Sequence, residues 1–233
     1  MLSGIGPTDH LKDFNIPLIK DLPVGFNLQD HVGLSMGFAT DKPIILDLAN
    51  SLLENMTYEL FQKGPLSSVG AEITAFLNSK FQTSMDSQPD LQITPTSAIS
   101  RSDSGENRAE NATSDEPNET MSLPIVNENT FSILLMLNRP ESRGRVLLRS
   151  NNPFDKPVLR MNYFDKETDV ERLADGGRII LELMETKAFK SINARYVNIS
   201  VPLCPKVEIL DEKYFECIMR LLKCQDQSTL EKP

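Results

Sequence analysis

Alternation of apolar and polar residues along the chain predicts short strands in two groups, separated by a long polar stretch. Runs with a period of two and a high content of β-branched and aromatic residues are typical of half-buried strands. A cluster of turn-forming residues at 139–144 separates two of these runs, which favours pairing of neighbouring strands through turns. The predicted strands span residues 32–40, 72–77, 91–94, 131–138, 145–149 and 158–162.

Apolar residues at helical spacing predict four helices among these strands. A short amphipathic helix begins near Pro7, and a second spans 46–63 and ends at Gly64-Pro65. The longest is expected over 165–190, with Val170, Leu173, Ile180, Leu183 and Met184 on one face. A final helix is expected over 211–222. Together the elements predict an α+β fold, in which a mostly antiparallel sheet is flanked by helices.

Residues 100–122 differ from the rest of the chain because they contain almost nothing apolar. A segment of this composition cannot bury enough surface to offset the entropy lost on ordering. We therefore expect a mobile loop there, inserted between the two groups of strands.

The overall charge restricts the classes of partner. The chain has 33 acidic against 24 basic side chains and a net charge of −9. Such a surface repels phosphate backbones, so we expect no binding to nucleic acid. The longest apolar run, 44–49, includes Asp47 and is too short to span a bilayer, so we expect no membrane span. No secretory leader stands before Ser3.

Cysteines and glycosylation sequons bear on the compartment. Cys204, Cys217 and Cys224 have no metal-binding spacing, which leaves two interpretations. They are either three buried free thiols, or a Cys204–Cys217 disulfide with Cys224 left over, which requires an oxidising compartment. Four N-x-Ser/Thr sequons favour a secreted or secretory-pathway protein; their asparagines are Asn55, Asn111, Asn118 and Asn198.

Motifs of common catalytic sites are absent from the sequence. It contains no G-x-G-x-x-G after a strand and no G-x-S-x-G, so neither a dinucleotide cradle nor a nucleophile elbow is predicted. His10 and His31 are its two histidines, too few for a metal cluster. We expect His10 at the surface, and His31 beside Asp30 in a structural role.

Two motifs near the start nevertheless resemble one enzyme family. Residues 3–7 read Ser-Gly-Ile-Gly-Pro and are followed by His10-Leu11, and residues 21–31 read Asp-Leu-Pro-Val-Gly-Phe-Asn-Leu-Gln-Asp-His. At this separation the pair resembles the second signature of the glucose–methanol–choline oxidoreductases and the segment after it. The resemblance continues through further segments up to about Arg220 and is closest to the arthropod glucose-dehydrogenase-like branch. Those segments are 63–66, 70–72, 139–149, 157–163 and 186–189.

The resemblance implies an FAD-dependent oxidoreductase that acts on CH–OH donors such as alcohols or sugars. In that family an alcohol gives a hydride to the flavin while a C-terminal histidine takes the hydroxyl proton. This sequence departs from the pattern at both ends. The glycine fingerprint for the ADP half of FAD is missing, and the tail from Leu221 to Pro233 contains no histidine. We therefore carry over no catalytic base, and the enzyme assignment of this chain stays open.

The resemblance also implies roles for individual residues. Glu72 matches a family glutamate that supports the active site; a solvent-facing strand glutamate explains it equally well. Segments that approach the flavin in family members contain Ser3, Gly4, Gly6, Gly25 and Asn27, although turn formation also uses these residue types. Arg139, Arg143 and Gly144 are expected to be structural turn residues.

The predicted organisation has three parts. Residues 1–40 are a remnant of a Rossmann-type FAD-binding domain, 41–222 the substrate-binding domain, and 223–233 an unrelated tail. Two functions fit this organisation. The first is an FAD-dependent oxidoreductase present as an inactive fragment, and the second is a non-catalytic, secreted binding module built on the substrate-domain sheet.

Overall fold

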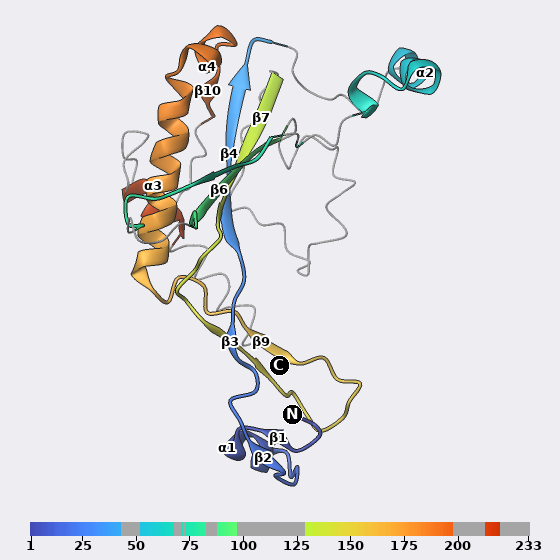
Figure 1. Cartoon of the computed structure of the whole chain (residues 1–233), viewed down its shortest axis with the longest axis vertical. Helices are drawn as coiled ribbons and strands as arrows, with labels where there is room; N and C mark the ends of the chain where they lie inside the picture. The colour runs from blue at the N-terminus through green and yellow to red at the C-terminus, as the bar shows by residue number, and fades with distance from the viewer. Residues whose placement is uncertain are drawn as a thin grey trace.

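The structure, a computed structural model, describes residues 1–42, 52–67, 71, 73–82, 88–96, 129–197 and 213–219. Figure 1 shows two groups of elements along the long axis of the molecule, with a large sheet and its helices in the upper group and small sheets in the lower. The predicted mobile loop at 100–122 lies outside the described residues.

A five-stranded antiparallel sheet forms the upper group, in the order β10-β4-β7-β6-β5. Its central pair, β4 and β7, is in register along nine residues, from Val32 opposite Leu137 to Thr40 opposite Asn129. β4 is the first strand of this sheet along the chain. Its residues belong to the N-terminal part, 1–40, that the sequence analysis predicts. The strands are β4 (Val32–Thr40), β5 (Ala75–Leu77), β6 (Leu91–Thr96), β7 (Asn129–Leu137) and β10 (Arg195–Tyr196).

One face of the five-stranded sheet is the core of the molecule. Because strand side chains alternate between faces, even residues of β4 and odd residues of β6 and β7 point the same way. Helix α3 (Glu167–Met184) packs on this face, so closely that a Cβ on Gly176 would lie 2.7 Å from Leu135 Cδ1. The shared core includes Leu34, Met36, Phe38, Leu91, Ile93, Phe131, Ile133, Leu135, Leu137, Val170, Leu173 and Ile180.

The lower group holds the remaining strands. β3 (Phe26–Leu28), β8 (Gly144–Leu147) and β9 (Val158–Arg160) form a three-stranded antiparallel sheet. Below it in Figure 1, β1 (Ile5–Gly6) and β2 (Lys20–Asp21) pair in parallel on either side of α1 (Thr8–Asp13). This is the one parallel pairing among the residues that the structure describes. The α+β fold with mostly antiparallel sheets is confirmed.

The long helix predicted over 165–190 is two helices in the structure. α3 ends at Met184, and α4 (Lys187–Ser191) begins after Thr186, whose ψ of 156° is extended. The Thr186 hydroxyl donates to the Leu183 carbonyl at 2.7 Å, which satisfies a carbonyl at the helix end. The buried face predicted for this helix is confirmed at Val170, Leu173, Ile180 and Met184.

The helix predicted over 46–63 is present as α2 (Leu52–Phe61) within the described residues and is followed by the 3-10 turn η1 (Pro65–Ser67). The described part of its predicted apolar stripe is exposed, at 50% for Met56 and 67% each for Leu60 and Phe61. Figure 1 shows α2 projecting away from the sheet. The segment 213–219 is helical and buries Tyr214, Phe215 and Ile218, as the sequence predicts.

Candidate functional site

The two N-terminal motifs meet in the lower group around the side chain of Met1. A Cβ on Gly6 would lie 3.0 Å from Met1 Cγ, and one on Gly25 would lie 3.1 Å from Met1 Cε. The structure therefore brings together the two segments that the resemblance placed near a flavin. Glu72 lies outside the described residues.

Both glycines with a positive φ in these motifs are required by the chain itself. Gly4 has φ +82°, and a Cβ there would lie 2.4 Å from the Pro17 carbonyl oxygen. Gly25 has φ +87°, and its Cβ would lie 2.1 Å from the Val146 carbonyl oxygen. Since the protein's own backbone fills the space where a side chain would begin, the packing of the chain itself requires glycine at both positions.

Asn27 connects the second motif to the turn before β8. It has φ 66°, a left-handed conformation that asparagine tolerates, and its Oδ1 accepts a hydrogen bond of 2.8 Å from Arg143 Nε. Arg143 also donates to the carbonyl of Ser142 at 3.0 Å. Gly144 packs against β9, where a Cβ would lie 2.3 Å from the Arg160 carbonyl oxygen. Arg143 lies in the turn before β8, whereas Gly144, predicted as a turn residue, is the first residue of β8.

The two histidines differ from each other in their surroundings. His10 is half-buried, and its Nε2 accepts a hydrogen bond of 3.0 Å from the Leu148 backbone N–H, so the prediction of a surface residue is wrong. The contact was missed because its partner lies far away in the sequence. His31 is exposed, and Asp30 Oδ1 accepts from its backbone N–H at 2.9 Å. The hydrogen bond therefore orients the His31 main chain, while the other Asp30 oxygen accepts from the Tyr163 hydroxyl.

The face of the five-stranded sheet opposite α3 is the candidate binding surface. It carries hydroxyl and amide groups in two short rows across the strands. Thr74 and Thr94 share a hydrogen bond of 3.0 Å between their hydroxyls, and Gln92 Nε2 donates to Thr94 Oγ1 at 3.3 Å. One step along, the hydroxyls of Thr96 and Ser132 are 2.7 Å apart. We call Thr74, Gln92, Thr94, Thr96 and Ser132 the hydroxyl face.

Most of the other described strand positions on this face are small or apolar; the charged exception is Arg195 of β10, which lies opposite Ala39 and pairs with Asp41. β4 contributes Gly33, Ser35, Gly37 and Ala39 to it, and β7 contributes Leu134 and Met136. A surface of neutral donors and acceptors beside apolar side chains suits a neutral, hydroxyl-bearing organic molecule. Sequence reasoning missed these residues, because alternation marks them only as the polar side of strands.

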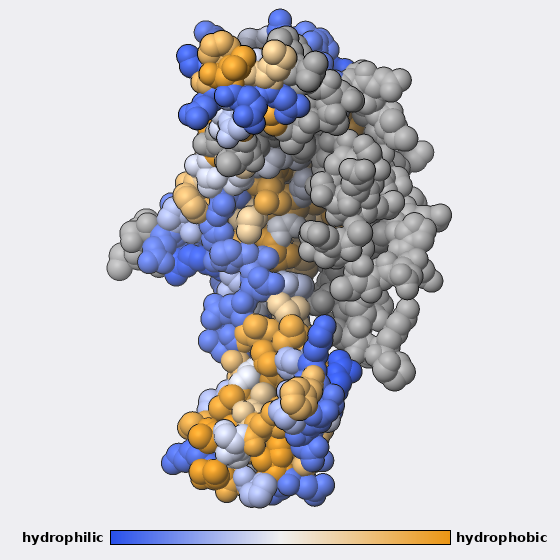
Figure 2. All heavy atoms as spheres, turned by 90° about the vertical axis from the view of Figure 1, so that its right-hand side faces the viewer, coloured by the Kyte–Doolittle hydropathy of each residue, from blue (hydrophilic) through white to orange (hydrophobic). Residues whose placement is uncertain are grey.

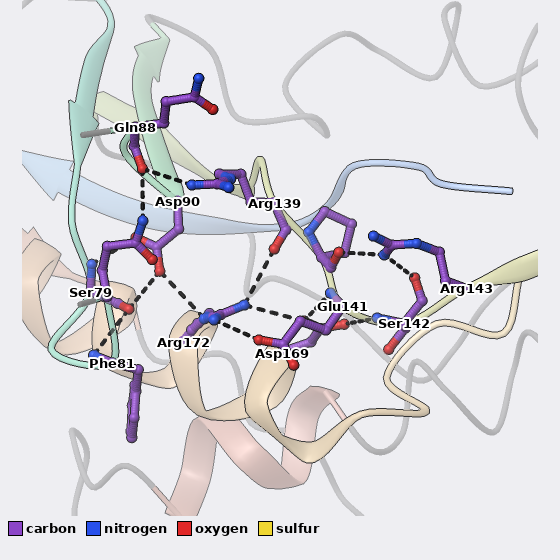
Figure 3. A network of polar contacts seen from close by, with 12 residues as sticks. Ser79, Phe81, Gln88, Asp90, Arg139, Glu141, Ser142, Arg143, Asp169 and Arg172 are labelled. Atoms are coloured by element: carbon purple, nitrogen blue, oxygen red, sulfur yellow. Dashed lines mark hydrogen bonds and ion pairs between the residues drawn. The ribbon is translucent and has the colours of Figure 1, made fainter. Parts of the chain in front are cut away.

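A buried polar network on the other side of the sheet holds the chain segments that frame this surface (Figure 3). Asp169 of α3 is fully buried and accepts hydrogen bonds of 2.8 Å from the backbone N–H groups of Glu141 and Ser142. Asp90 is likewise fully buried and accepts from the N–H of Ser79 at 2.8 Å.

Arg172 links the two parts of this network through the carboxylates of Glu141 and Asp90. Its Nη2 is 2.7 Å from Glu141 Oε1, its Nε is 3.5 Å from Asp90 Oδ2, and its Nη1 donates to the Arg139 carbonyl at 3.3 Å. One guanidinium thus ties α3 to the start of β6 and to the turn that leads into β8. Because each buried charge has a partner, the network is a structural clamp.

The described residues offer neither a metal-binding cluster nor a membrane-spanning helix. No group of three or more His, Cys, Asp or Glu residues there could hold a metal ion. No helix in the described part of the chain is long and apolar enough to cross a membrane. Cys217 is disulfide-bonded, and the chain's other two cysteines lie outside the described residues.

Known proteins with similar sequences and folds support a flavin-oxidoreductase class. Residues 140–225 match the family described as GMC oxidoreductase. The chain is 30% identical over 222 residues to a glucose dehydrogenase [FAD, quinone] of Drosophila melanogaster, covering 94% of this chain and 33% of that protein. It is 28% identical over 229 residues to an ecdysone oxidase of Bombyx mori, covering 95% of this chain and 33% of that protein.

The fold comparison agrees with the sequence comparison. A formate oxidase structure from Aspergillus oryzae superposes with a TM-score of 0.67 at 22% identity, covering 94% of this chain and 39% of that one. The chain is thus related in sequence and fold to the glucose–methanol–choline oxidoreductases, as its motifs predicted. It spans about a third of the length of the curated relatives that it matches.

Proposed function

We propose that this chain is the substrate-facing part of an FAD-dependent oxidoreductase that acts on CH–OH donors such as alcohols or sugars. The hydroxyl face carries the proposal, because it offers neutral hydrogen-bonding groups on the face of the sheet opposite α3. The similarity to glucose dehydrogenase and ecdysone oxidase supports the same class of reaction.

The chain by itself is expected to be inactive. The sequence contains no G-x-G-x-x-G fingerprint, and no catalytic base is assigned among the described residues. The approach of Ser3, Gly4, Gly6, Gly25 and Asn27 to FAD, and the support of the active site by Glu72, stay predictions for a full-length protein. Purified chain should be colourless and should not reduce a dye with glucose, and a yellow, active sample would contradict this.

A chimera tests the proposed function. We would replace the matching part of the Drosophila glucose dehydrogenase with residues 1–220 of this chain, and measure flavin absorbance and dye reduction over a panel of sugars and alcohols. We expect bound flavin and alcohol-dependent reduction. In that chimera Thr94→Val should raise KM several-fold, while Thr57→Val on α2 should leave it unchanged. A flavin-loaded chimera that reduces dye with no member of the panel would refute the proposal.

A secreted, glycosylated protein is the setting that we propose for this activity. Asn55 lies exposed on α2, where a glycan has room, and the disulfide at Cys217 fits an oxidising compartment. Glycans at Asn111, Asn118 and Asn198 and the pairing of Cys217 with Cys204 are predictions outside the described residues. Peptide mass spectrometry of protein secreted from insect cells, with and without glycosidase, would identify the modified positions.

The alternative function is a non-catalytic, secreted binding module. The buried clamp around Arg172 favours it, because the sheet and its helix have a core of their own. This alternative requires a monomer that unfolds cooperatively and binds no hydrophobic dye. Static light scattering and calorimetry of the purified chain would separate the two functions.

A further inference from the structure

Strands β8 and β9 of the lower group lie in a segment with an excess of positive charge. Residues 142–164 include five basic side chains and one acidic side chain, in a chain whose net charge is −9. Charges in water act over only about 10 Å at ordinary ionic strength, so this segment attracts anions although the whole protein is acidic. The basic residues are Arg143, Arg145, Arg149, Lys156 and Arg160, and the acidic residue is Asp155.

Several of these charged side chains have partners in the turns beside the strands. Arg143 Nε donates to Asn27 Oδ1 at 2.8 Å, and Arg149 Nε donates to a main-chain carbonyl at 3.3 Å. Asp155 accepts hydrogen bonds from two side chains of its own loop. These contacts stabilise the turns, and they distinguish Arg143 and Arg149 from the two arginines within the strands.

Those two arginines form a row with Phe26 across β3, β8 and β9. Arg145 is opposite Phe26 on one side and opposite Arg160 on the other, so the three side chains lie on one face of the sheet. Arg145 Cζ lies 4.1 Å from the centroid of the Phe26 ring. All three side chains are exposed. Figure 2 shows hydrophilic side chains beside hydrophobic ones over this lower part of the molecule. We call Phe26, Arg145 and Arg160 the arginine row.

The arginine row places two like charges directly opposite each other. Side chains at such positions have Cβ atoms roughly 5 Å apart, and like charges there destabilise a sheet. Among the residues that the structure describes, neither guanidinium has a carboxylate within ion-pair distance. The Phe26 ring stabilises the position of Arg145 but neutralises neither charge. An anion between the two guanidinium groups would remove their repulsion.

Two adjacent guanidinium groups suit a compact anion with several oxygens. Each presents paired N–H groups that can bind two oxygens of one phosphate or carboxylate. A doubly charged anion balances both arginines, whereas a single carboxylate balances only one. Because Phe26 holds Arg145 in place beforehand, less entropy is lost on binding. An anionic membrane fits this site less well, since it requires a larger cluster of available cations.

We propose that the arginine row is a binding site for a dianionic oxyanion of the phosphate class, either free or as the ester of a small molecule. Arg145 and Arg160 donate to the oxygens of the anion, and Phe26 orients Arg145. The arginine row belongs to the three-stranded sheet and the hydroxyl face to the five-stranded sheet, so this proposal does not depend on the proposed function.

Isothermal titration calorimetry of the full chain at low ionic strength tests the proposal, with inorganic phosphate and phenyl phosphate as the probes. We expect saturable binding, weakened about tenfold or more by Arg145→Gln and by Arg160→Gln. Arg160→Lys should have an intermediate affinity, because it keeps the charge and loses the paired N–H groups. Arg149→Gln is the matched control. It removes the same charge from the same hairpin, and it should change the affinity by less than about twofold.

The results of the titration either support or overturn the proposal. Tighter binding of phenyl phosphate would support it and identify an ester as the ligand, and equal binding would support it with the free anion. Absence of saturable binding to the unmodified chain would overturn it. An equal loss with Arg149→Gln would indicate a diffuse positive field and overturn it too. The same holds if hexaglutamate or phosphatidylserine vesicles bind more tightly than both phosphate probes.

Thermal unfolding provides a second measurement on the same variants. At equal ionic strength, phosphate should raise the unfolding midpoint of the unmodified chain above its value in chloride, because a ligand that binds the folded state stabilises it. The rise should be smaller in both Gln variants than in Arg149→Gln. Stabilisation by exclusion of phosphate from the protein surface acts on all of them alike. An equal rise in every variant would therefore contradict a defined site. Circular dichroism checks that the variants are folded.

Discussion

At the scale of single residues, whether a glycine can be replaced by a larger residue depends on how close the neighbouring atoms lie. Gly25 and Gly64 have almost the same φ, +87° and +88°, but different surroundings. A Cβ on Gly25 would overlap the Val146 carbonyl oxygen, whereas on Gly64 the nearest atom would be Thr57 Cγ2 at 3.6 Å. Comparing alanine substitutions at these two positions therefore distinguishes the free-energy cost of a left-handed conformation from the free-energy cost of a steric clash.

Gly25→Ala should destabilise the protein by about 3 kcal/mol or more, because strain at φ and backbone overlap act together. Gly64→Ala should cost only about 1 kcal/mol, the price of the left-handed conformation alone. Urea unfolding followed by circular dichroism measures both. Equal losses would show that β8 moves away from Gly25 at little cost.

Asp169 is the residue on which the buried clamp depends most. Asp169→Ala should lower the free energy of unfolding by about 2–4 kcal/mol, because the N–H groups of Glu141 and Ser142 lose their acceptor and Arg172 loses a counter-charge. Glu182→Ala is the control on the same helix; its exposed ion pair with Arg178 should contribute less than about 1 kcal/mol. A similar loss in both variants would mean that α3, and not the clamp, is the sensitive element.

At the scale of elements, the exposed carboxylate of Asp41, directly after β4, contacts β10 and the residues before it. Asp41 Oδ2 accepts from Asn193 Nδ2 at 2.7 Å, and Oδ1 lies 3.1 Å from Arg195 Nη1. The hydrogen bond from Asn193, followed by that from Arg195, lowers the pKa of Asp41 below its ordinary value. The ionised form is therefore favoured in the folded state.

The lowered pKa predicts how this contact depends on pH. Its contribution to stability is present above the ordinary pKa of an aspartate and is lost as the pH falls through the lowered value. Asp41→Asn should remove that dependence. Thermal melts of both proteins between neutral and acidic pH would show the difference as converging midpoints at low pH. Parallel curves would contradict the assignment.

At the scale of the whole molecule, exposed apolar surface distinguishes the two proposed functions. Side chains such as Ile19 at 73% and Phe154 at 92% remain in contact with water. Large exposed patches favour association or binding of hydrophobic dyes. We expect the purified chain to bind 8-anilinonaphthalene-1-sulfonate and to self-associate with rising concentration. Ile19→Glu together with Leu22→Glu should reduce both, as measured by fluorescence and sedimentation velocity, while Leu60→Glu should reduce them less.

The sequence by itself determined the longer strands, most of the helices and the relationship to a flavin-oxidoreductase family. Val32–Thr40, the turn at 139–144 and the buried face of α3 follow from local periodicity and turn chemistry, which need only neighbouring residues. The motifs at 3–7 and 21–31 indicated the family for the same reason, since each is a contiguous pattern. The break at Thr186 was missed because apolar spacing continues across it.

Only the tertiary structure decided which of these residues meet. His10 contacts Leu148, Asn27 contacts Arg143, and Arg172 gathers Asp90 with Glu141, all across long sequence separations. The hydroxyl face likewise exists only once β5, β6 and β7 are in register, because β6 supplies three of its groups, β7 supplies Ser132, and Thr74 lies directly before β5. The exposure of Leu60 and Ile19 depends on what packs nearby, which spacing alone cannot indicate. Pairing and burial are properties of the folded chain, because they depend on residues that lie far apart in the sequence.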